Sequence, residues 1–242
     1  PMEGWEGWDS VSMNQMVRKL QPGIIINNRS KLPEDFGTPE EHITAEERDW
    51  EACMTFNGLS WGYIDSAQAA PYSYNAQGIL KMLNTVCAGG GNLLLNIGPT
   101  PEGKVPQEAV APLQTVGKWL ETNGDAVYGN LQVAGRWAPS GAGALTTKAN
   151  TAYFWVKIWP SGGELGLGGF EATLKSATIV GTGQQVDFEQ KPYRILLKDL
   201  PAVCPDTVAG VGVIALEFDE PPKFTFCVGH PQLHGGRATP GA

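Results

Sequence analysis

The sequence predicts an α/β region followed by an antiparallel β-sandwich. In residues 1–130, helix-like and strand-like segments alternate with short links, which is the pattern of α/β folds. After about residue 128, short β-branched or aromatic segments are separated by Gly, Pro and Asp, a spacing typical of antiparallel sandwiches. The 31 Gly and 18 Pro, with only 17% charged residues, suit strands and loops better than a helix bundle.

The first predicted helix begins near Ser10, which can cap it, and Pro22-Gly23 ends it. Its apolar residues recur at the i, i+3, i+4 and i+7 spacing of one helix face: Met13, Met16, Val17 and Leu20. The run "GIIINNR" at 23–29 then predicts a strand that is apolar on both faces, as a parallel sheet covered by helices requires.

The same alternation continues to about residue 124. We predict strands at 49–56 and 92–98, and helices from about 76 to 86 and from about 106 to 124. Each helix has one apolar face: Ala76, Ile79, Leu80, Leu83 and Val86 in the first, and Val110, Leu113, Val116 and Leu120 in the second.

The stretch "GGGNLLLNIGPT" at 89–100 resembles a phosphate-binding loop only in its glycines. Such a loop places glycines after a strand and before a helix, so that backbone N–H groups face the anion. Here the glycines follow a helix and precede a strand. We therefore predict a helix C-cap and a tight turn that leads into a buried strand.

The second half contains five short strand-like runs: "AYFWVKIW", "ATLKSATIV", "QVDFE", "YRILLKDL" and "VGVIALEF". We expect an α/β domain at 1–127, a β-sandwich domain at 128–230 and a disordered tail at 231–242.

Charge and composition exclude two function classes. The net charge is −8 and basic runs are absent, so nucleic-acid binding is not expected. The apolar stretches are too short to span a bilayer.

The four cysteines lack CxxC spacing, and we expect buried free thiols rather than a zinc site. We predict neither a metal nor a cofactor. Because the chain starts at Pro1, its compartment stays open.

Polar residues gather where the predicted strands end, at 27–29, 57–63 and 96–100. Functional sites of α/β folds lie at this edge of the sheet. The loop "PEDFGTPEEHITAEERDWE" at 33–51 follows Arg29 and holds eight carboxylates. It can be a solvated surface loop, or it can supply a general acid/base. Trp61 can be a core aromatic or can cover the C–H patch of a sugar ring.

Five motifs resemble the α-L-fucosidases of glycoside hydrolase family 29 in order and spacing: "LQPGIIINNR", "EDFGTPE", "WEACMTFNGLSWGY", "AGGGNLLLNIGPTPEG" and "VGKWLETNGDAVYG". The resemblance covers about residues 5–130. It implies the second half of a (β/α)8-like barrel, with 23–29, 49–56 and 92–98 as late strands, followed by a β-sandwich. It also implies a retaining, exo-acting hydrolase that forms a covalent fucosyl-enzyme.

The family resemblance also implies roles for particular residues. The nucleophile, an Asp, is expected upstream of Pro1; Asp9 in "GWDS" is interpreted as a helix cap. The acid/base is Glu40 in "DFGTPE", with Glu51 as the alternate and Glu41 third. Arg29 would bind the sugar or orient the nucleophile, and Trp61 would pack against the C6 methyl.

The expected partners are a fucosylated oligosaccharide or glycoconjugate and the N-terminal half of the same enzyme, and a homo-oligomer is possible. On this view residues 1–125 do not close a barrel alone, because closure takes eight strand–helix units. Two alternatives stay open: a non-catalytic carbohydrate-binding fragment and another retaining glycosidase.

Overall fold

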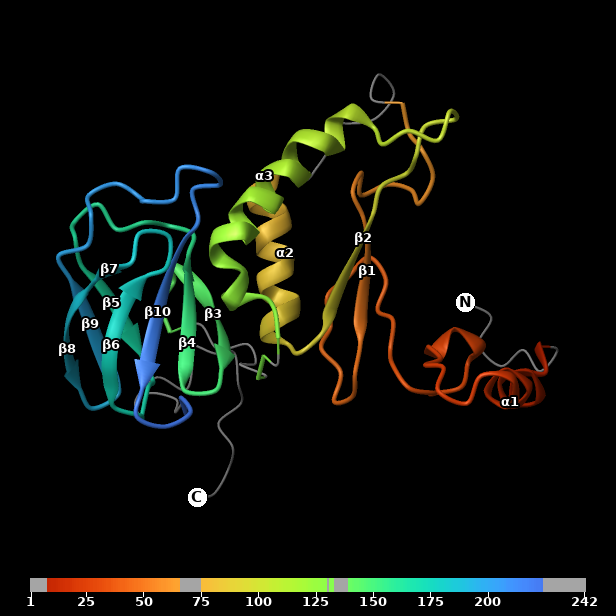
Figure 1. Ribbon diagram of the computed structural model, residues 1–242, viewed down its shortest axis with the longest axis horizontal. Helices are drawn as coiled ribbons and strands as arrows, with labels where there is room; N and C mark the ends of the chain where they lie inside the picture. Colours follow the sequence, from red (N-terminus) through yellow and green to blue (C-terminus); the bar gives the residue numbers. More distant parts are fainter. Residues whose placement is uncertain (1–7, 66–74, 130, 133–138, 224–242) are drawn as a thin grey trace, which may run out of the picture.

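The computed structural model describes residues 8–65, 75–129, 131–132 and 139–223. The protein is elongated, with a β-sandwich at one end and helix α1 at the other (Figure 1). Between them lie a small parallel sheet and helices α2 and α3. The expected tail at 231–242 lies outside the described residues.

The three predicted helices form, and their bounds are α1 (Ser10–Leu20), α2 (Ala76–Ala88) and α3 (Gln107–Asn123). Asn75 caps α2, since its side-chain oxygen accepts a hydrogen bond from the Gly78 N–H at 2.8 Å. After α2, Gly90 has a φ of 74°, the left-handed conformation that glycine adopts most readily. The glycines at 89–91 therefore form a helix end and a turn, as predicted.

The apolar face of α1 is largely exposed in the described part of the chain. Met13, Met16 and Leu20 are 40%, 56% and 74% exposed, and the buried residue of α1 is Asn14. The Asn14 amide donates to Ser30 Oγ at 2.9 Å and to Glu34 Oε1 at 2.6 Å. The helix thus attaches through its polar side, and the described residues leave its apolar side uncovered.

The start of α1 also differs from the prediction. Asp9 occupies the N-cap position, as interpreted, but its side chain makes no capping hydrogen bond because its backbone is left-handed, with a φ of 47°. Ser10 lies inside the helix, and its hydroxyl donates to the Ser30 carbonyl at 2.5 Å. Ser10 therefore helps attach α1 instead of capping it.

The strand predicted at 23–29 does not form. Asn27 makes an isolated parallel bridge to Phe36, and a short 3-10 helix follows at Asn28–Ser30. Ile25 is 73% exposed. A β-strand needs a neighbouring strand that pairs with it along its length. Among the described residues, the segment at 23–29 pairs only with residues 35–36.

Two of the expected strands form a parallel pair, β1 (Glu51–Thr55) and β2 (Asn92–Asn96). The segment at 37–41, expected to be a loop, lies along the other side of β1. Two parallel bridges join them, Gly37 to Trp50 and Glu40 to Cys53. The described residues thus supply successive parallel segments without closing a barrel. β2 is less buried than predicted, because Leu94 faces the open side and is exposed.

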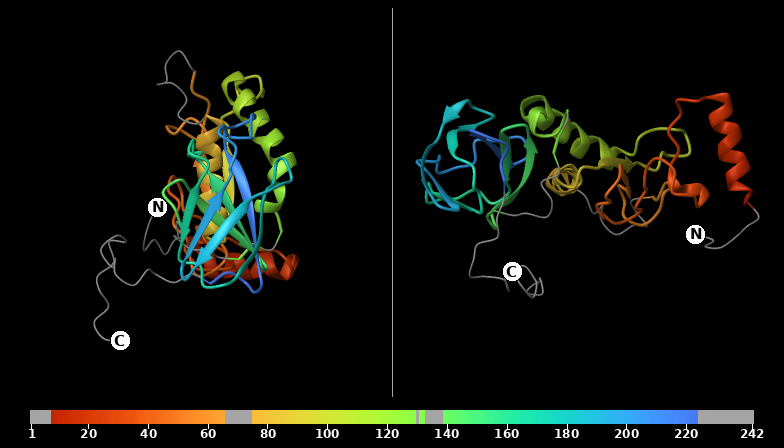
Figure 2. Two further views of the ribbon diagram at one scale, coloured as in Figure 1. Left: turned by 90° about the vertical axis from the view of Figure 1, so that its left-hand side faces the viewer. Right: turned by 90° about the horizontal axis from the view of Figure 1, so that it is seen from below.

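The second half is an antiparallel sandwich of two sheets (Figure 2). The larger has the order β3-β4-β10-β6-β7 and the smaller β5-β9-β8. The strand bounds are β3 (Gly143–Lys148), β4 (Thr151–Val156), β5 (Leu165–Gly168), β6 (Leu174–Ile179), β7 (Gln184–Gln185), β8 (Asp187–Lys191), β9 (Arg194–Lys198) and β10 (Gly212–Phe218). Strands β3 and β5 were not predicted from the sequence.

A shared core fixes the sandwich to the helices. Trp119 of α3 and Trp155 of β4 are both buried, with ring centroids 4.7 Å apart. The Trp119 indole N–H donates to the Val211 carbonyl at 2.7 Å. These contacts bury large aromatic surfaces across the boundary, so the sandwich and the helices form one packed unit.

The cysteines follow the prediction in part. Cys53 and Cys87 are buried free thiols, whereas Cys204 is a free thiol that is partly exposed. Burial raises the pKa of the Cys87 thiol to about 11. Cys227 lies outside the described residues.

Candidate active site

Arg29 reaches the segment at 37–41 through three hydrogen bonds. The Asn27 side chain fixes the turn by accepting from the Arg29 N–H at 3.0 Å. The Arg29 Nε–H donates to Thr38 Oγ1 at 2.7 Å, and Nη2–H donates to the Thr38 carbonyl at 3.4 Å. Nη1–H donates to Glu40 Oε2 at 2.5 Å. The guanidinium is therefore held in one orientation beside the Glu40 carboxylate.

Backbone pairing with β1 places Glu40. The Cys53 N–H donates to the Pro39 carbonyl, and the Glu41 N–H donates to the Cys53 carbonyl, both at 2.9 Å. In parallel strands, bridged residues point to the same side of the sheet and alternate residues share a face. Glu40, Cys53 and Thr55 therefore lie on one face of the sheet. Met54 lies on the other face, in the core shared with the helices.

The loop after β1 brings in Trp61. Asn57 organises this loop, since its side-chain oxygen accepts from the N–H groups of Leu59 and Ser60, both at 2.8 Å. At the end of β2, the Asn96 amide donates to the Trp61 carbonyl at 2.8 Å. The Trp61 side chain is 40% exposed. It is thus held at the carboxyl ends of β1 and β2 rather than in the core.

The pKa of the Glu40 carboxyl is lowered. The largest cause is the hydrogen bond from Arg29, and hydrogen bonding by the Trp61 side chain contributes less. Glu40 therefore lies beside both Arg29 and Trp61, although these three residues, all singled out in the sequence, come from three different segments.

The other two candidate carboxylates are placed differently from Glu40. Glu41 has a left-handed backbone, with a φ of 60°, and its Oε1 accepts from the Thr55 N–H at 3.2 Å; it holds the end of β1. Glu51 is the first residue of β1, at the opposite end of the strand from the Trp61 loop. Thr55 ends the strand four residues later, about 13 Å away at 3.3 Å per residue.

A cavity of about 730 Å³ lies over this contact. That volume is within the usual range for small-ligand sites, roughly 300–1,000 Å³. Its lining is polar except for Pro39 and the indole of Trp8: Trp8, Asn28, Arg29, Lys31, Thr38, Pro39, Glu40, Glu41 and His42. Its walls offer two carboxylates, cations and an indole ring, which can bind a polyol.

Two residues of this site were missed in the sequence. Thr38 stands two positions before Glu40, and the period-2 rule for strands would have placed it on the same face. Cys53 is buried, and its thiol lies against the Arg29 guanidinium; burial and Glu51 raise its pKa, while Arg29 lowers it. No local signal identified Cys53, because its position beside Arg29 depends on strand pairing.

The described residues contain no group of three or more His, Cys, Asp or Glu side chains arranged to hold a metal ion. None of the helices in the described ranges is long and apolar enough to cross a membrane.

Comparison with known proteins gives a consistent result. A family profile described as Alpha-L-fucosidase matches residues 3–125, about half of the chain. An α-L-fucosidase of Branchiostoma floridae is 34% identical over 159 residues, which cover 57% of this chain and 34% of that protein. The chain thus spans about a third of the length of this relative.

Solved structures match over more of the chain. Alpha-L-fucosidase isoenzyme 1 from Paenibacillus thiaminolyticus has a TM-score of 0.77 at 28% identity, covering 89% of this chain and 55% of that one. An α-L-fucosidase from Bacteroides thetaiotaomicron, trapped as a covalent intermediate with 2-fluoro-fucosyl fluoride, has a TM-score of 0.75 at 25% identity, covering 88% and 53%. The chain belongs to the α-L-fucosidase family.

Proposed function

We propose that the intact protein is an exo-acting, retaining α-L-fucosidase that releases L-fucose from fucosylated glycans. The observation that carries this proposal is the Arg29–Glu40 pair, which lines one cavity of a chain of this family and has Trp61 beside Glu40. A cation, a carboxylate and an exposed indole suit a sugar with polar hydroxyls and one apolar face.

In this proposal residues 1–127 are the second half of a (β/α)8-like barrel and residues 128–230 are the sandwich domain. The parallel pairing of 37–41, β1 and β2 supports it. So do the exposed apolar side of α1 and the exposed Leu94 of β2, because contiguous exposed apolar surface marks a place where another protein surface packs. The N-terminal half of the same enzyme would cover them.

The proposed reaction has two steps. An Asp from the N-terminal half attacks the anomeric carbon, the glycosidic C–O bond breaks, and Glu40 gives its proton to the leaving oxygen. Water then attacks the same carbon, Glu40 takes a proton from it, and the Asp leaves. The covalent intermediate trapped in the Bacteroides thetaiotaomicron relative supports this two-step scheme.

The charge of Glu40 has to change during this cycle. With Arg29 beside it, its lowered pKa favours the carboxylate, which is the form needed to activate water. A second carboxylate within a few ångströms raises the pKa of its neighbour. We infer that the nucleophile competes for Arg29, and that this competition returns Glu40 to the protonated form for the first step.

Position favours Glu40 over Glu51 as the acid/base. Glu40 lies beside Arg29 and Trp61, and Trp61 lies at the carboxyl ends of β1 and β2, where α/β folds carry their sites. Glu51 is at the amino end of the same strand, and Glu41 is bound to the backbone of Thr55.

The decisive experiment replaces Glu40 by alanine in the full-length protein. Loss of a general acid costs about 10²- to 10⁴-fold, so hydrolysis of a fucoside with a poor leaving group should fall by that factor. A fucoside of an acidic phenol should keep its first step, and azide should restore turnover by attacking the fucosyl-enzyme. Glu47→Ala is the matched control, because Glu47 is exposed in the same segment.

Other outcomes lead to other conclusions. If Glu51→Ala gives this pattern and Glu40→Ala does not, the acid/base is Glu51. If the full-length protein binds fucose without hydrolysing any aryl glycoside, it is a carbohydrate-binding protein. Inhibition by galactose in place of fucose would indicate another retaining glycosidase.

A further inference from the structure

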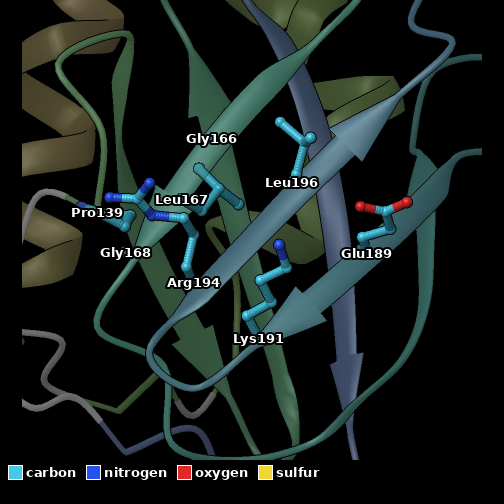
Figure 3. Close-up of a pocket in the computed structure, with 8 residues that line it drawn as sticks. All are labelled: Pro139, Gly166, Leu167, Gly168, Glu189, Lys191, Arg194 and Leu196. Carbon is cyan, nitrogen blue, oxygen red and sulfur yellow. The ribbon is translucent and has the colours of Figure 1, made fainter.

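We propose that the outer face of the small sandwich sheet is a second saccharide site, which binds an anionic glycan through Arg194 and Lys191. A groove of about 440 Å³ lies on this face, away from the cavity around Glu40. Its lining residues come from β5, β9 and β8 and from the neighbouring Pro139 (Figure 3).

The register of the sheet places the lining residues in two rows. Gly166, Leu196 and Glu189 are directly opposite one another across the three strands. Gly168, Arg194 and Lys191 form the next outward row. Each row therefore runs from a glycine on the edge strand β5 to a charged residue on β8.

The two glycines open the groove. A Cβ at Gly166 would meet nothing within 4 Å, and one at Gly168 would come no closer than 3.7 Å to the Pro139 carbonyl oxygen. Neither position excludes a side chain, and glycine within a strand costs about 0.5–1 kcal/mol relative to alanine. Because glycine has no side chain, these two positions leave open space in the groove beside Leu196.

The cations in this groove are available to a ligand. Among the described residues, Arg194 has no hydrogen bond or ion pair from its guanidinium, and Lys191 has only a longer-range attraction to Glu189. Glu189 is itself bound by Lys198. In Figure 3, Arg194 extends toward Gly168 and Pro139, while Glu189 lies at the other side of the groove.

The hairpin that carries both cations is fixed in place. The Gly169 N–H donates to the Tyr193 carbonyl at 2.7 Å, and the Gly168 N–H donates to the Pro139 carbonyl at 2.9 Å. Arg194 and Lys191 are paired residues of the β8–β9 ladder. Two cations are thus held side by side, although the protein as a whole carries a net charge of −8.

This arrangement suits a sulfate ester or a carboxylate on a sugar. A guanidinium forms paired hydrogen bonds to either group, and the glycine and leucine floor offers an apolar surface to the C–H groups of a ring. The choice of a saccharide over another anion rests on the proposed fucosidase function. The site would hold the charged part of a glycan while the other cavity processes it.

The test measures binding of three saccharides to the full-length protein by calorimetry: dextran sulfate oligosaccharides, oligogalacturonate and neutral dextran. The first two separate sulfate from carboxylate recognition. We expect binding of at least one anionic saccharide, weakened by salt, and none of neutral dextran. Replacing Arg194 or Lys191 by glutamine should weaken binding roughly tenfold each, because hydrogen bonds to charged groups are the stronger class.

Two further variants make the result specific. Gly166→Leu fills the groove without changing charge and should also weaken binding at least tenfold. Lys175→Gln removes an exposed cation from β6, in the other sheet, and should leave binding unchanged. Equal loss in Lys175→Gln, or equal binding of neutral dextran, would overturn the proposal, as would failure of both anionic saccharides to bind.

The site is separable from catalysis. The groove variants should hydrolyse a small aryl fucoside at the parent rate, whereas Glu40→Ala should lose hydrolysis and keep anionic glycan binding. A protein that binds the anionic saccharide but hydrolyses no fucoside would contradict the proposed function and leave the groove assignment standing.

Discussion

Replacing Gly98 by alanine should displace the loop that carries Trp61. Gly98 follows β2, and its backbone packs directly against the backbone of Gly62. A Cβ built on Gly98 would lie 2.4 Å from the Gly62 carbonyl oxygen and 2.7 Å from the Tyr63 nitrogen. These neighbours are main-chain atoms, so no side-chain rotation can relieve the contact.

The size of the displacement follows from these distances. Ordinary van der Waals contact begins near 3.4 Å, so the two backbones must separate by about 1 Å to fit the methyl group. Overpacking of this kind costs roughly 1–3 kcal/mol of stability. A 1 Å misplacement of a group that positions substrate costs about 10²-fold in rate. We therefore expect kcat/KM for an aryl fucoside to fall about a hundredfold.

The assay compares Gly98→Ala with Gly117→Ala in the full-length protein. Gly117 lies within α3, and a Cβ there would meet nothing within 4 Å. Alanine is the better helix former by about 1 kcal/mol, so this variant should be slightly more stable and fully active. An unchanged kcat/KM for Gly98→Ala, with a native melting curve, would refute the argument that this close contact positions Trp61.

Three further predictions concern the site and the core. Arg29→Met should raise the pKa of Glu40, because the guanidinium is the main cause of its lowering. The general acid must be protonated, so the alkaline limb of the kcat/KM profile should move to higher pH. An unmoved limb would exclude Glu40 as the acid. Trp61→Ala should erase much of the preference for aryl L-fucosides over L-galactosides, which we expect to be ten- to a few hundred-fold if the C6 methyl packs on the indole as proposed. Equal losses on both sugars with a lower melting temperature would indicate a core role. Trp119→Phe should lower the free energy of unfolding by about 2–4 kcal/mol, because it leaves the Val211 carbonyl without its hydrogen-bond donor and opens a small cavity. A denaturant midpoint unchanged from the parent would contradict this.

The positions of the three helices were predicted from the sequence alone, because they are determined by residues within or next to each helix. The three helices depend on i, i+3, i+4 spacing and on end residues such as Gly90, and both signals lie within a few residues of the segments they describe. The strands at 51–55 and 92–96 were predicted for a similar reason, because each is a short apolar run bounded by polar or glycine residues. Strands β3 and β5 were missed because β3 begins with Gly and Ala and has no aromatic residue, Val or Ile, while Gly and Leu alternate in β5. Neither has the run of large β-branched or aromatic residues that marked the predicted strands.

The tertiary structure decided which side of each element is buried and which residues meet. The apolar residues of α1 do share one helix face, yet in the described chain the helix packs through Asn14. Which face of a helix is buried depends on the segments that pack against it, and the sequence of the helix alone does not contain that information. Arg29, Glu40 and Trp61 were selected singly from motifs. Their contact, and the place of Cys53 beside them, depends on the parallel pairing of 37–41 with β1, a register that no single segment encodes.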